Sequence, residues 1–200
     1  GIQSLMEGLS KSLLKHGPVK VFADKYLNSE SYDQESNLDT TRINGFKIFR
    51  KFRKAFLVNE YLKNNTVKAI FFDHWKSLEY IKLEYINKIP NFCLIHAKEI
   101  NHPLGSSLNI RMNKAFRKSK FIIANSKYTK DLAINMKLDE NKIHIINPGT
   151  DYPIKIEKEE EIKATKIFGS SFPRIITVAR LDKRKSHQNI LMTIKNLVPT

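Results

Sequence analysis

The sequence predicts an α/β fold in which a parallel sheet carries helices on both faces, followed by the start of a second unit of the same kind. Apolar strand-like segments alternate with amphipathic helical segments at least five times along the chain. Strands separated by helices pair in parallel, because each crossover returns the chain to the same edge of the sheet. Hydrophobic residues make up 41% of the 200 residues, so a sizeable core is expected.

The first half of the chain begins with a helix of clear periodicity, which Gly17-Pro18 should end. The polar stretch 24–45 has no such periodicity and is expected to be a long loop. The elements expected up to residue 95 are a helix over 2–13, a strand over 19–23, the loop over 24–45, a helix over 46–64, a strand over 67–72, a helix over 77–88 and a strand over 92–95.

The second half continues the alternation. Ser106 or Ser107 should cap one helix, and Ser126 another, because a serine hydroxyl accepts a free backbone N–H at a helix start. The remaining elements expected are a helix ending at 118, a strand over 121–124, a helix over 127–137, a strand over 143–146, a helix beginning in the acidic stretch 157–161, a strand over 174–179 and a helix over 186–198.

A stretch rich in Pro and Gly, residues 147–153, favours a boundary between two domains. We expect one domain over 1–148 and a linker with the start of a second domain over 149–200. Gly1 opens directly into the helical pattern, so we expect both ends to be truncated, with a first strand missing.

Composition narrows the classes of partner. The net charge of +15 favours anionic partners, although the Lys-, Ile- and Asn-rich composition accounts for the charge equally well. The single cysteine, Cys93, fits a reducing, cytoplasmic compartment, and no apolar run approaches the roughly 18 residues of a transmembrane helix.

Candidate functional residues follow the strands, because ligands bind outside the carboxyl ends of parallel strands. Arg180 and Lys185 follow the last expected strand and precede a helix, an arrangement suited to a diphosphate. His96 ends a strand and can bond a hydroxyl or carry a proton. His74 and Trp75 are candidates for a sugar pocket on the acceptor side. Each residue also has a structural interpretation, as a solvated turn or ordinary packing.

The helix over 46–64 mixes cationic and apolar residues in its first half. Such a helix either lies on an anionic membrane surface or packs on the sheet with a charged outer face. The residues concerned are Lys47, Arg50, Lys51, Arg53 and Lys54 among Phe46, Ile48, Phe49 and Phe52. No metal-ligand spacing, phosphate-binding Walker loop or nucleophile elbow is present in the sequence.

Three segments together resemble the retaining glycosyltransferases of family 4, whose GT-B fold has two Rossmann-like domains facing a cleft. Residues 121–132 are similar to that family's strand leading into an Asn-Ser-x-x-Thr helix. Residues 142–151 are similar to its interdomain stretch. Residues 175–185 are similar to its Gly-Arg-Leu-x-x-x-Lys-Gly turn, with Ala179 and Ser186 in place of glycines.

The resemblance implies a sugar transfer from a nucleotide sugar to an acceptor hydroxyl, with retention, in polysaccharide, lipopolysaccharide or glycolipid synthesis. It implies that Arg180, Lys185 and Gly1 contact the donor diphosphate, that His96 lies close to the transferred sugar, and that no divalent metal is needed. The family's two-glutamate motif would lie beyond Thr200, so we expect these 200 residues alone to be inactive.

Two alternatives stay open from the sequence. The first is a non-catalytic module of the same fold that binds anions or phosphosugars. The second is a nucleic-acid-binding protein, which only the charge favours, since no recognition module is evident. A peripheral position on the inner face of a membrane is a further expectation, carried by the basic helix.

Overall fold

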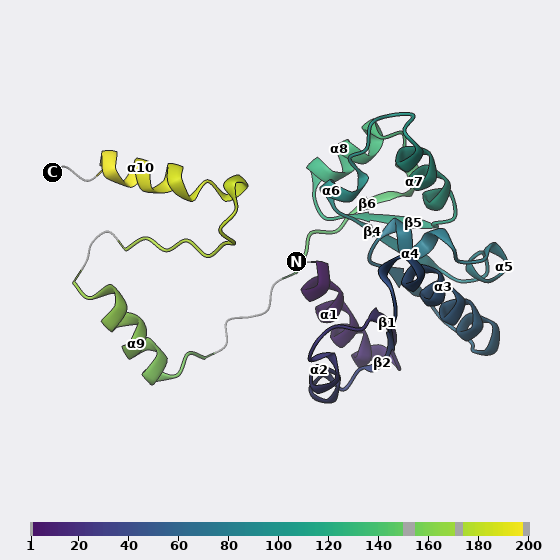
Figure 1. The fold of residues 1–200 in the computed structure, drawn as a ribbon, viewed down its shortest axis with the longest axis horizontal. Coiled ribbons are helices and arrows are strands. Elements are labelled where there is room, and N and C mark those ends of the chain that lie inside the picture. The colour runs from purple at the N-terminus through teal and green to yellow at the C-terminus, as the bar shows by residue number, and fades with distance from the viewer. Residues whose placement is uncertain (1, 150–154, 171–173, 198–200) are drawn as a thin grey trace. The chain divides into compact units, whose positions relative to one another are not determined.

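The computed structural model describes residues 2–149, 155–170 and 174–197, with no account of the side chains of residues 184 and 197. The chain forms two compact units, unit 1 over Gly1–Thr150 and unit 2 over Asp151–Thr200. Figure 1 shows the elements of both units. The division falls within the Pro- and Gly-rich stretch 147–153.

Unit 1 alternates strands and helices along its whole length. In chain order its elements are α1 (Ile2–Leu13), η1 (Leu14–His16), β1 (Lys20–Asp24), α2 (Ser29–Ser36), β2 (Asp39–Ile43), α3 (Lys47–Asn64), β3 (Ile70–Phe72), α4 (Trp75–Glu79), α5 (Leu83–Ile86), β4 (Asn91–Ile95), α6 (Ala97–Ile100), α7 (Ser107–Arg117), β5 (Phe121–Ala124), α8 (Lys127–Asn135), η2 (Glu140–Lys142) and β6 (Ile143–Ile145).

The strands of unit 1 form two sheets in which every described pair is parallel. One sheet has the order β1-β2 and the other the order β3-β4-β5-β6. Figure 1 shows β1 and β2 beside α1 and α2, and β4 to β6 among α6, α7 and α8. The predicted α/β class with parallel sheets is therefore confirmed.

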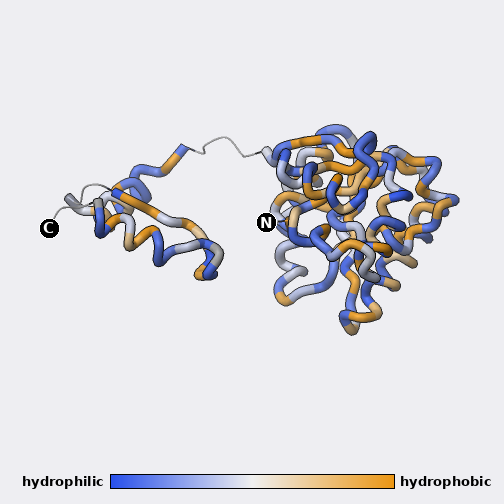
Figure 2. Tube along the Cα trace, turned by 90° about the horizontal axis from the view of Figure 1, so that it is seen from above, coloured by the Kyte–Doolittle hydropathy of each residue, from blue (hydrophilic) through white to orange (hydrophobic). Residues whose placement is uncertain are grey.

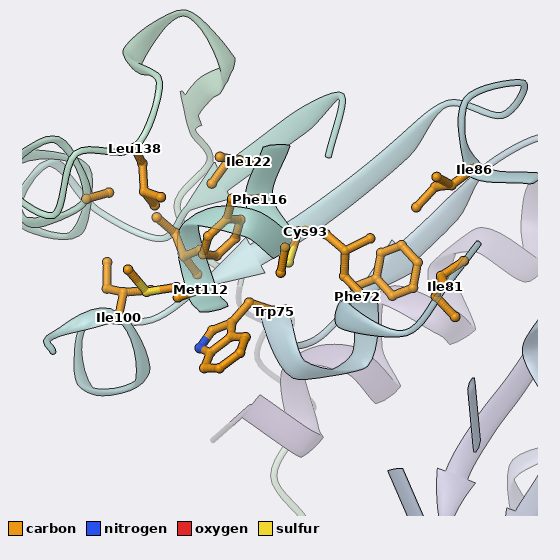
Figure 3. Packing of buried hydrophobic residues seen from close by; sticks show 14 of the residues in the cluster. Phe72, Trp75, Ile81, Ile86, Cys93, Ile100, Met112, Phe116, Ile122 and Leu138 are labelled. Carbon is orange, nitrogen blue, oxygen red and sulfur yellow. The ribbon is translucent and has the colours of Figure 1, made fainter. Parts of the chain in front are cut away.

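The core of unit 1 lies between the larger sheet and its helices. Helices α4 and α7 pack against each other, as do α6 and α8. Figure 3 shows side chains from these elements meeting around Trp75, Met112 and Phe116. Half-buried aromatic rings also lie against one another across neighbouring strands, with centroids 4.8 Å apart for Phe71–Phe92 and 4.9 Å for Phe92–Phe121. Contacts on this scale hold neighbouring strands in register.

The long loop predicted over 24–45 is wrong, because it contains α2 and β2. Helix α2 is polar on all sides, so it has no apolar period to reveal it. Asn28 and Asn37 bound it in the left-handed conformation, which asparagine tolerates better than most residues. Arg42 of β2 donates from Nε to Asp33 of α2 at 2.8 Å and ties the two elements together.

The single helix predicted over 77–88 is divided into α4 and α5. The side-chain amide of Asn59, on α3, donates to the carbonyl of Tyr80 at 3.2 Å and accepts from the N–H of Lys82 at 3.0 Å. These tertiary hydrogen bonds occupy backbone groups that a continuous helix would pair internally. The sequence over 77–88 has a helical period, but the hydrogen bonds from Asn59 on α3 interrupt the helix.

Unit 2 contains α9 (Lys158–Phe168), η3 (Lys183–Lys185) and α10 (His187–Leu197). The strand predicted over 174–179 is not formed, and that prediction is wrong for this structure. A strand needs a neighbour for its backbone hydrogen bonds, and the described part of unit 2 offers none. Ile176 and Val178 are accordingly 72% and 88% exposed. Figure 2 shows hydrophobic stretches along this unit as well as along unit 1.

None of the described helices is long and apolar enough to cross a bilayer.

Candidate functional site

Polar side chains gather where β3, β4 and β5 end. Asp73, His96 and Asn125 follow these strands directly. The strands are parallel and paired in register, with Phe72 opposite Cys93 and Ile95 opposite Ala124, so the three residues share the carboxyl edge of the larger sheet. That edge is where an open parallel sheet binds its ligands.

His96 is half-buried at this edge, as the N-cap of α6. Its backbone N–H donates to Oε1 of Glu99, which holds the turn between β4 and α6. Its Nε2 is buried and has no hydrogen-bond partner among the described residues. Burial lowers the pKa of His96, with Asp73 opposing the shift, so the ring is neutral at pH 7. A neutral imidazole can donate to and accept from a hydroxyl group.

His74 caps α4 at the end of β3. Its Nδ1 accepts from the backbone N–H of Lys76 at 3.0 Å. Burial lowers the pKa of His74 to about 4, and the nearby Lys76, His96 and His102 lower it as well, while Asp73 opposes them. The ring is therefore neutral at physiological pH and remains a candidate for the acceptor pocket.

The prediction that Trp75 lines a sugar pocket needs correction. Its indole is completely buried in the core, between the residues that Figure 3 shows. Its Nε1 donates to the carbonyl of Glu99 at 3.0 Å. Because neither face of the indole ring is exposed, the ring cannot stack on a sugar. Trp75 instead supports the histidines around it.

His102 was missed by sequence reasoning. It lies after α6 rather than directly after a strand, so the rule that ligands bind where parallel strands end does not identify it. Its ring meets the indole of Trp75 edge-on, with centroids 6.3 Å apart. Its Nε2 is also buried and without a partner in the described part of the chain. The only local signal was its position six residues after His96 in the same connection.

The turn after β5 carries the cap that the sequence predicts. The hydroxyl of Ser126 accepts from the N–H of Thr129 at 3.2 Å, and Ser106 does the same for Asn109 at the start of α7. The hydroxyl of Thr129 in turn donates to Oδ1 of Asn125 at 2.6 Å. Ser126 and Thr129 thus fix the Asn125 side chain at the edge of the sheet.

Arg180 and Lys185 both lie in unit 2, on the segment that leads into α10. Both side chains are exposed. His187, near the start of α10, has its Nε2 2.9 Å from the carbonyl of Arg180, which ties the two ends of the turn together. Ser186 follows Lys185 at φ +52°, a conformation that favours glycine. Sequence reasoning did not identify His187, because its role depends on the shape of the turn.

Gly1, the third predicted diphosphate contact, lies outside the described residues. In the parts of the chain described here, no three His, Cys, Asp or Glu side chains are placed to hold a metal ion.

Helix α3 presents an unexpected face to solvent. Large apolar side chains at its N-cap and along it are exposed, with Phe46 at 84%, Phe49 at 67% and Phe56 at 62%. Two of its cations instead turn inward, where Lys54 Nζ lies 2.6 Å and Arg50 Nη1 3.6 Å from carboxylate oxygens of Asp24. The outer face of this half is therefore mixed, because exposed aromatic rings lie on it together with the exposed cations Lys47 and Arg53.

Comparison with known proteins places the fold in context. Residues 1–152 match Glycosyltransferase Family 4. The chain is also similar to solved structures of Anabaena Alr3699/HepE: 17% identical with a TM-score of 0.71 to its complex with UDP, and 18% with 0.69 to its complex with UDP and glucose. A third structure, with UDP-glucose, gives 17% and 0.67.

Each match covers the whole of this chain, which spans about half of the solved chains, 55% for the first two and 54% for the third. At these identities the likeness shows the fold alone. Among curated proteins none matches.

Proposed function

The chain belongs to Glycosyltransferase Family 4, and from that membership we propose that the protein transfers a sugar from a nucleotide-sugar donor to an acceptor hydroxyl, with retention and without a metal. The observation that carries the proposal is the family match over unit 1 together with its neutral histidines at the carboxyl edge of the sheet. The solved complexes of HepE with UDP and UDP-glucose support a nucleotide sugar as donor.

Arg180 and Lys185 are proposed to hold the donor diphosphate. When the sugar leaves, negative charge builds up on the departing phosphate, and fixed cations stabilise that charge. Both residues precede α10, whose N-terminal backbone N–H groups favour an anion. Gly1 is proposed to line the same donor site, as the family resemblance implies.

His96 and His74 are proposed to bind hydroxyl groups of the sugars. A neutral imidazole offers both a donor and an acceptor, and this holds for His96. In neutral His74, whose Nδ1 accepts from the N–H of Lys76, Nε2 carries the proton and can donate to a hydroxyl group. We also propose that the acceptor belongs to polysaccharide, lipopolysaccharide or glycolipid synthesis and that the protein works in the cytoplasm.

The test is a transfer assay on the full-length protein with a panel of nucleotide sugars, in which NMR reports the anomeric configuration of the product. We expect the retained anomer, formed in the presence of a metal chelator. An inverted product would contradict retention, and binding without turnover would favour the anion-binding module instead. Residues 1–200 alone are expected to show no turnover.

A peripheral membrane position is proposed from the exposed face of α3. Phe46, Phe49 and Phe56 are large apolar side chains in contact with water, and Lys47 and Arg53 beside them are exposed cations. Apolar side chains flanked by cations bind anionic bilayer surfaces, through burial of the apolar groups and attraction to the headgroups.

Sedimentation with phosphatidylglycerol vesicles tests this position. Replacing both Phe49 and Phe56 by serine should reduce binding more than tenfold, since burying a phenylalanine contributes about 1.5–3 kcal/mol. Tyr128→Ser is the matched control, because Tyr128 is an aromatic residue 68% exposed on α8. Equal binding by the double variant and the control would remove α3 from the proposal. Arg50 is a poor choice for this test because its ion pair with Asp24 supports unit 1.

A further inference from the structure

We propose that the amino edge of the larger sheet binds a phosphoryl group, carried by a soluble phosphate ester or by a lipid headgroup. A cavity of about 250 Å³ lies at this edge, beside Asn91, the first residue of β4, and beside Lys120 and Lys142, which directly precede β5 and β6. Strand β4 has five residues at about 3.3 Å each, so the two edges of the sheet are roughly 15 Å apart. The cavity is therefore separate from the candidate site at the carboxyl edge.

The lining of the cavity is strongly cationic. It includes four cations and no acidic side chain of the described residues, and the cations are Arg117, Lys118, Lys120 and Lys142. Like charges repel one another, and the repulsion is stronger where the protein excludes part of the water. An anion in the cavity would offset this repulsion, so the lining selects an anionic ligand.

Two of the cations are held in place by the backbone. Lys118 Nζ donates to two carbonyl oxygens at the end of α4, at 2.7 and 3.0 Å. Lys142 Nζ donates to two carbonyl oxygens at the end of α7, at 3.1 and 3.0 Å. Cations in such positions satisfy the free carbonyls of a helix end. An ammonium group has three N–H donors, so each lysine keeps one for a ligand.

The other two cations have no such structural role. The side chains of Arg117 and Lys120 are exposed, and neither has a hydrogen bond or ion pair within the described part of the chain. The turn that carries them is nevertheless fixed, because the buried amide of Asn91 accepts from the N–H of Lys120 at 2.9 Å and donates to the carbonyl of Ile86 at 3.2 Å. Two unpaired cations thus stand on a rigid turn beside two ordered ones.

The electrostatics of Lys118 also favour a bound anion. Burial lowers the pKa of Lys118, and the neighbouring Lys114 lowers it further, while Glu79 opposes the shift. Glu79 is already paired with Arg111, whose Nε lies 2.8 Å from its Oε1. A phosphoryl group in the cavity would supply the counter-charge that Glu79 gives only in part.

The size and the charge of the cavity favour a phosphoryl group. A phosphate monoester carries a charge of about −1.5 to −2 and three acceptor oxygens, which suits four cations better than the single charge of a carboxylate. A volume of about 250 Å³ equals that of roughly eight water molecules at about 30 Å³ each, enough for a phosphoryl group and a small substituent. Single-stranded nucleic acid is less suited, because no aromatic side chain of the described residues lines the cavity to stack on a base.

Glycerol 3-phosphate is the probe for the test, titrated into the full-length protein while NMR follows the backbone amides. The signals of Ser119 and Lys120 should shift and saturate, and that of Ser126, at the opposite edge of the sheet, should not shift. Glycerol, which lacks the phosphoryl group, should cause no shift. Shifts confined to Ser126, or no shift at the cavity with either glycerol 3-phosphate or inorganic phosphate, would overturn the proposal.

A charge-matched pair of double variants tests the cations themselves. Arg117→Gln with Lys120→Gln should weaken binding of glycerol 3-phosphate at least about tenfold, the effect of losing charge-assisted hydrogen bonds. Lys15→Gln with Lys63→Gln is the control, because it removes the same charge from exposed positions on η1 and α3 and should leave the affinity unchanged. Equal affinities in the two double variants would refute the assignment.

Vesicles of phosphatidic acid distinguish the two sources of the phosphoryl group. Weaker sedimentation of the Arg117 and Lys120 double variant than of its control would identify a lipid headgroup, and equal sedimentation with the tenfold loss in solution would identify a soluble ester. Amide shifts at the cavity with single-stranded RNA, but with neither phosphate probe, would replace this proposal by a nucleic-acid partner. None of these measurements involves sugar transfer, so their outcome is independent of the proposed transferase function.

Discussion

Replacing Trp75 by phenylalanine tests the support on which the histidine site rests. The indole is fully buried, so the smaller ring leaves a cavity worth about 1–2 kcal/mol. The change also removes the hydrogen bond from Nε1 to the Glu99 carbonyl, for about another 1 kcal/mol. We expect the free energy of unfolding of unit 1 to fall by about 2–3 kcal/mol.

Urea denaturation followed by circular dichroism measures this loss, because Trp75 is the only tryptophan and its fluorescence disappears with the substitution. Tyr128→Phe is the control, since the exposed hydroxyl of Tyr128 should contribute less than about 0.5 kcal/mol. If Trp75→Phe lowered the midpoint no more than this control, the burial and the hydrogen bond of the indole would both be in question.

Three further predictions follow from single side chains. Burial lowers the pKa of His74 from 6.5 to about 4, so between these two pH values the unfolded chain binds a proton that the folded chain does not. The free energy of unfolding should therefore fall as the pH is lowered from 6.5 to 4, which urea midpoints measured against pH would show. His74→Asn, which keeps the cap of α4, should make the urea midpoint less dependent on pH. Asn37 is exposed at φ +53°, so Asn37→Gly should be neutral or stabilising by thermal melting and Asn37→Val should cost about 1–2 kcal/mol; equal melting temperatures would contradict this conformation. The Cys93 thiol is fully buried and burial raises its pKa, so Ellman's reagent should modify it only in denaturant, and rapid labelling of the folded protein would argue against the β4 core.

The fold of unit 1 was largely predictable because its strands and most helices carry clear apolar patterns. Strand β4 is a short apolar run in the sequence and is buried on both faces. Ser126 caps α8, as predicted. Helix α2 was not predictable from periodicity, because the ion pair of Asp33 with Arg42 and two left-handed asparagines define it. The break between α4 and α5 depends on Asn59, which is distant in sequence and contributes no local signal.

The candidate site was predictable where it follows strands and not elsewhere. His96 stands directly after β4 and His74 two residues after the end of β3, so the rule for parallel sheets finds both. His102 is brought to them by the path of the chain after α6, and only the packing around Trp75 reveals it. Trp75 itself was misassigned, because a tryptophan after a strand has the same sequence pattern whether it faces a ligand or the core.

Calorimetric titration of the full-length protein with a panel of nucleotide sugars tests most directly whether Arg180 and Lys185 form the donor diphosphate site. Lys185→Ala should weaken binding of the preferred nucleotide sugar at least about tenfold, the effect of one charge-assisted hydrogen bond, whereas Lys195→Ala, an exposed lysine in the last turn of α10, should leave it unchanged. Equal affinity in the two variants, or no binding of any nucleotide sugar to the parent protein, would contradict the account.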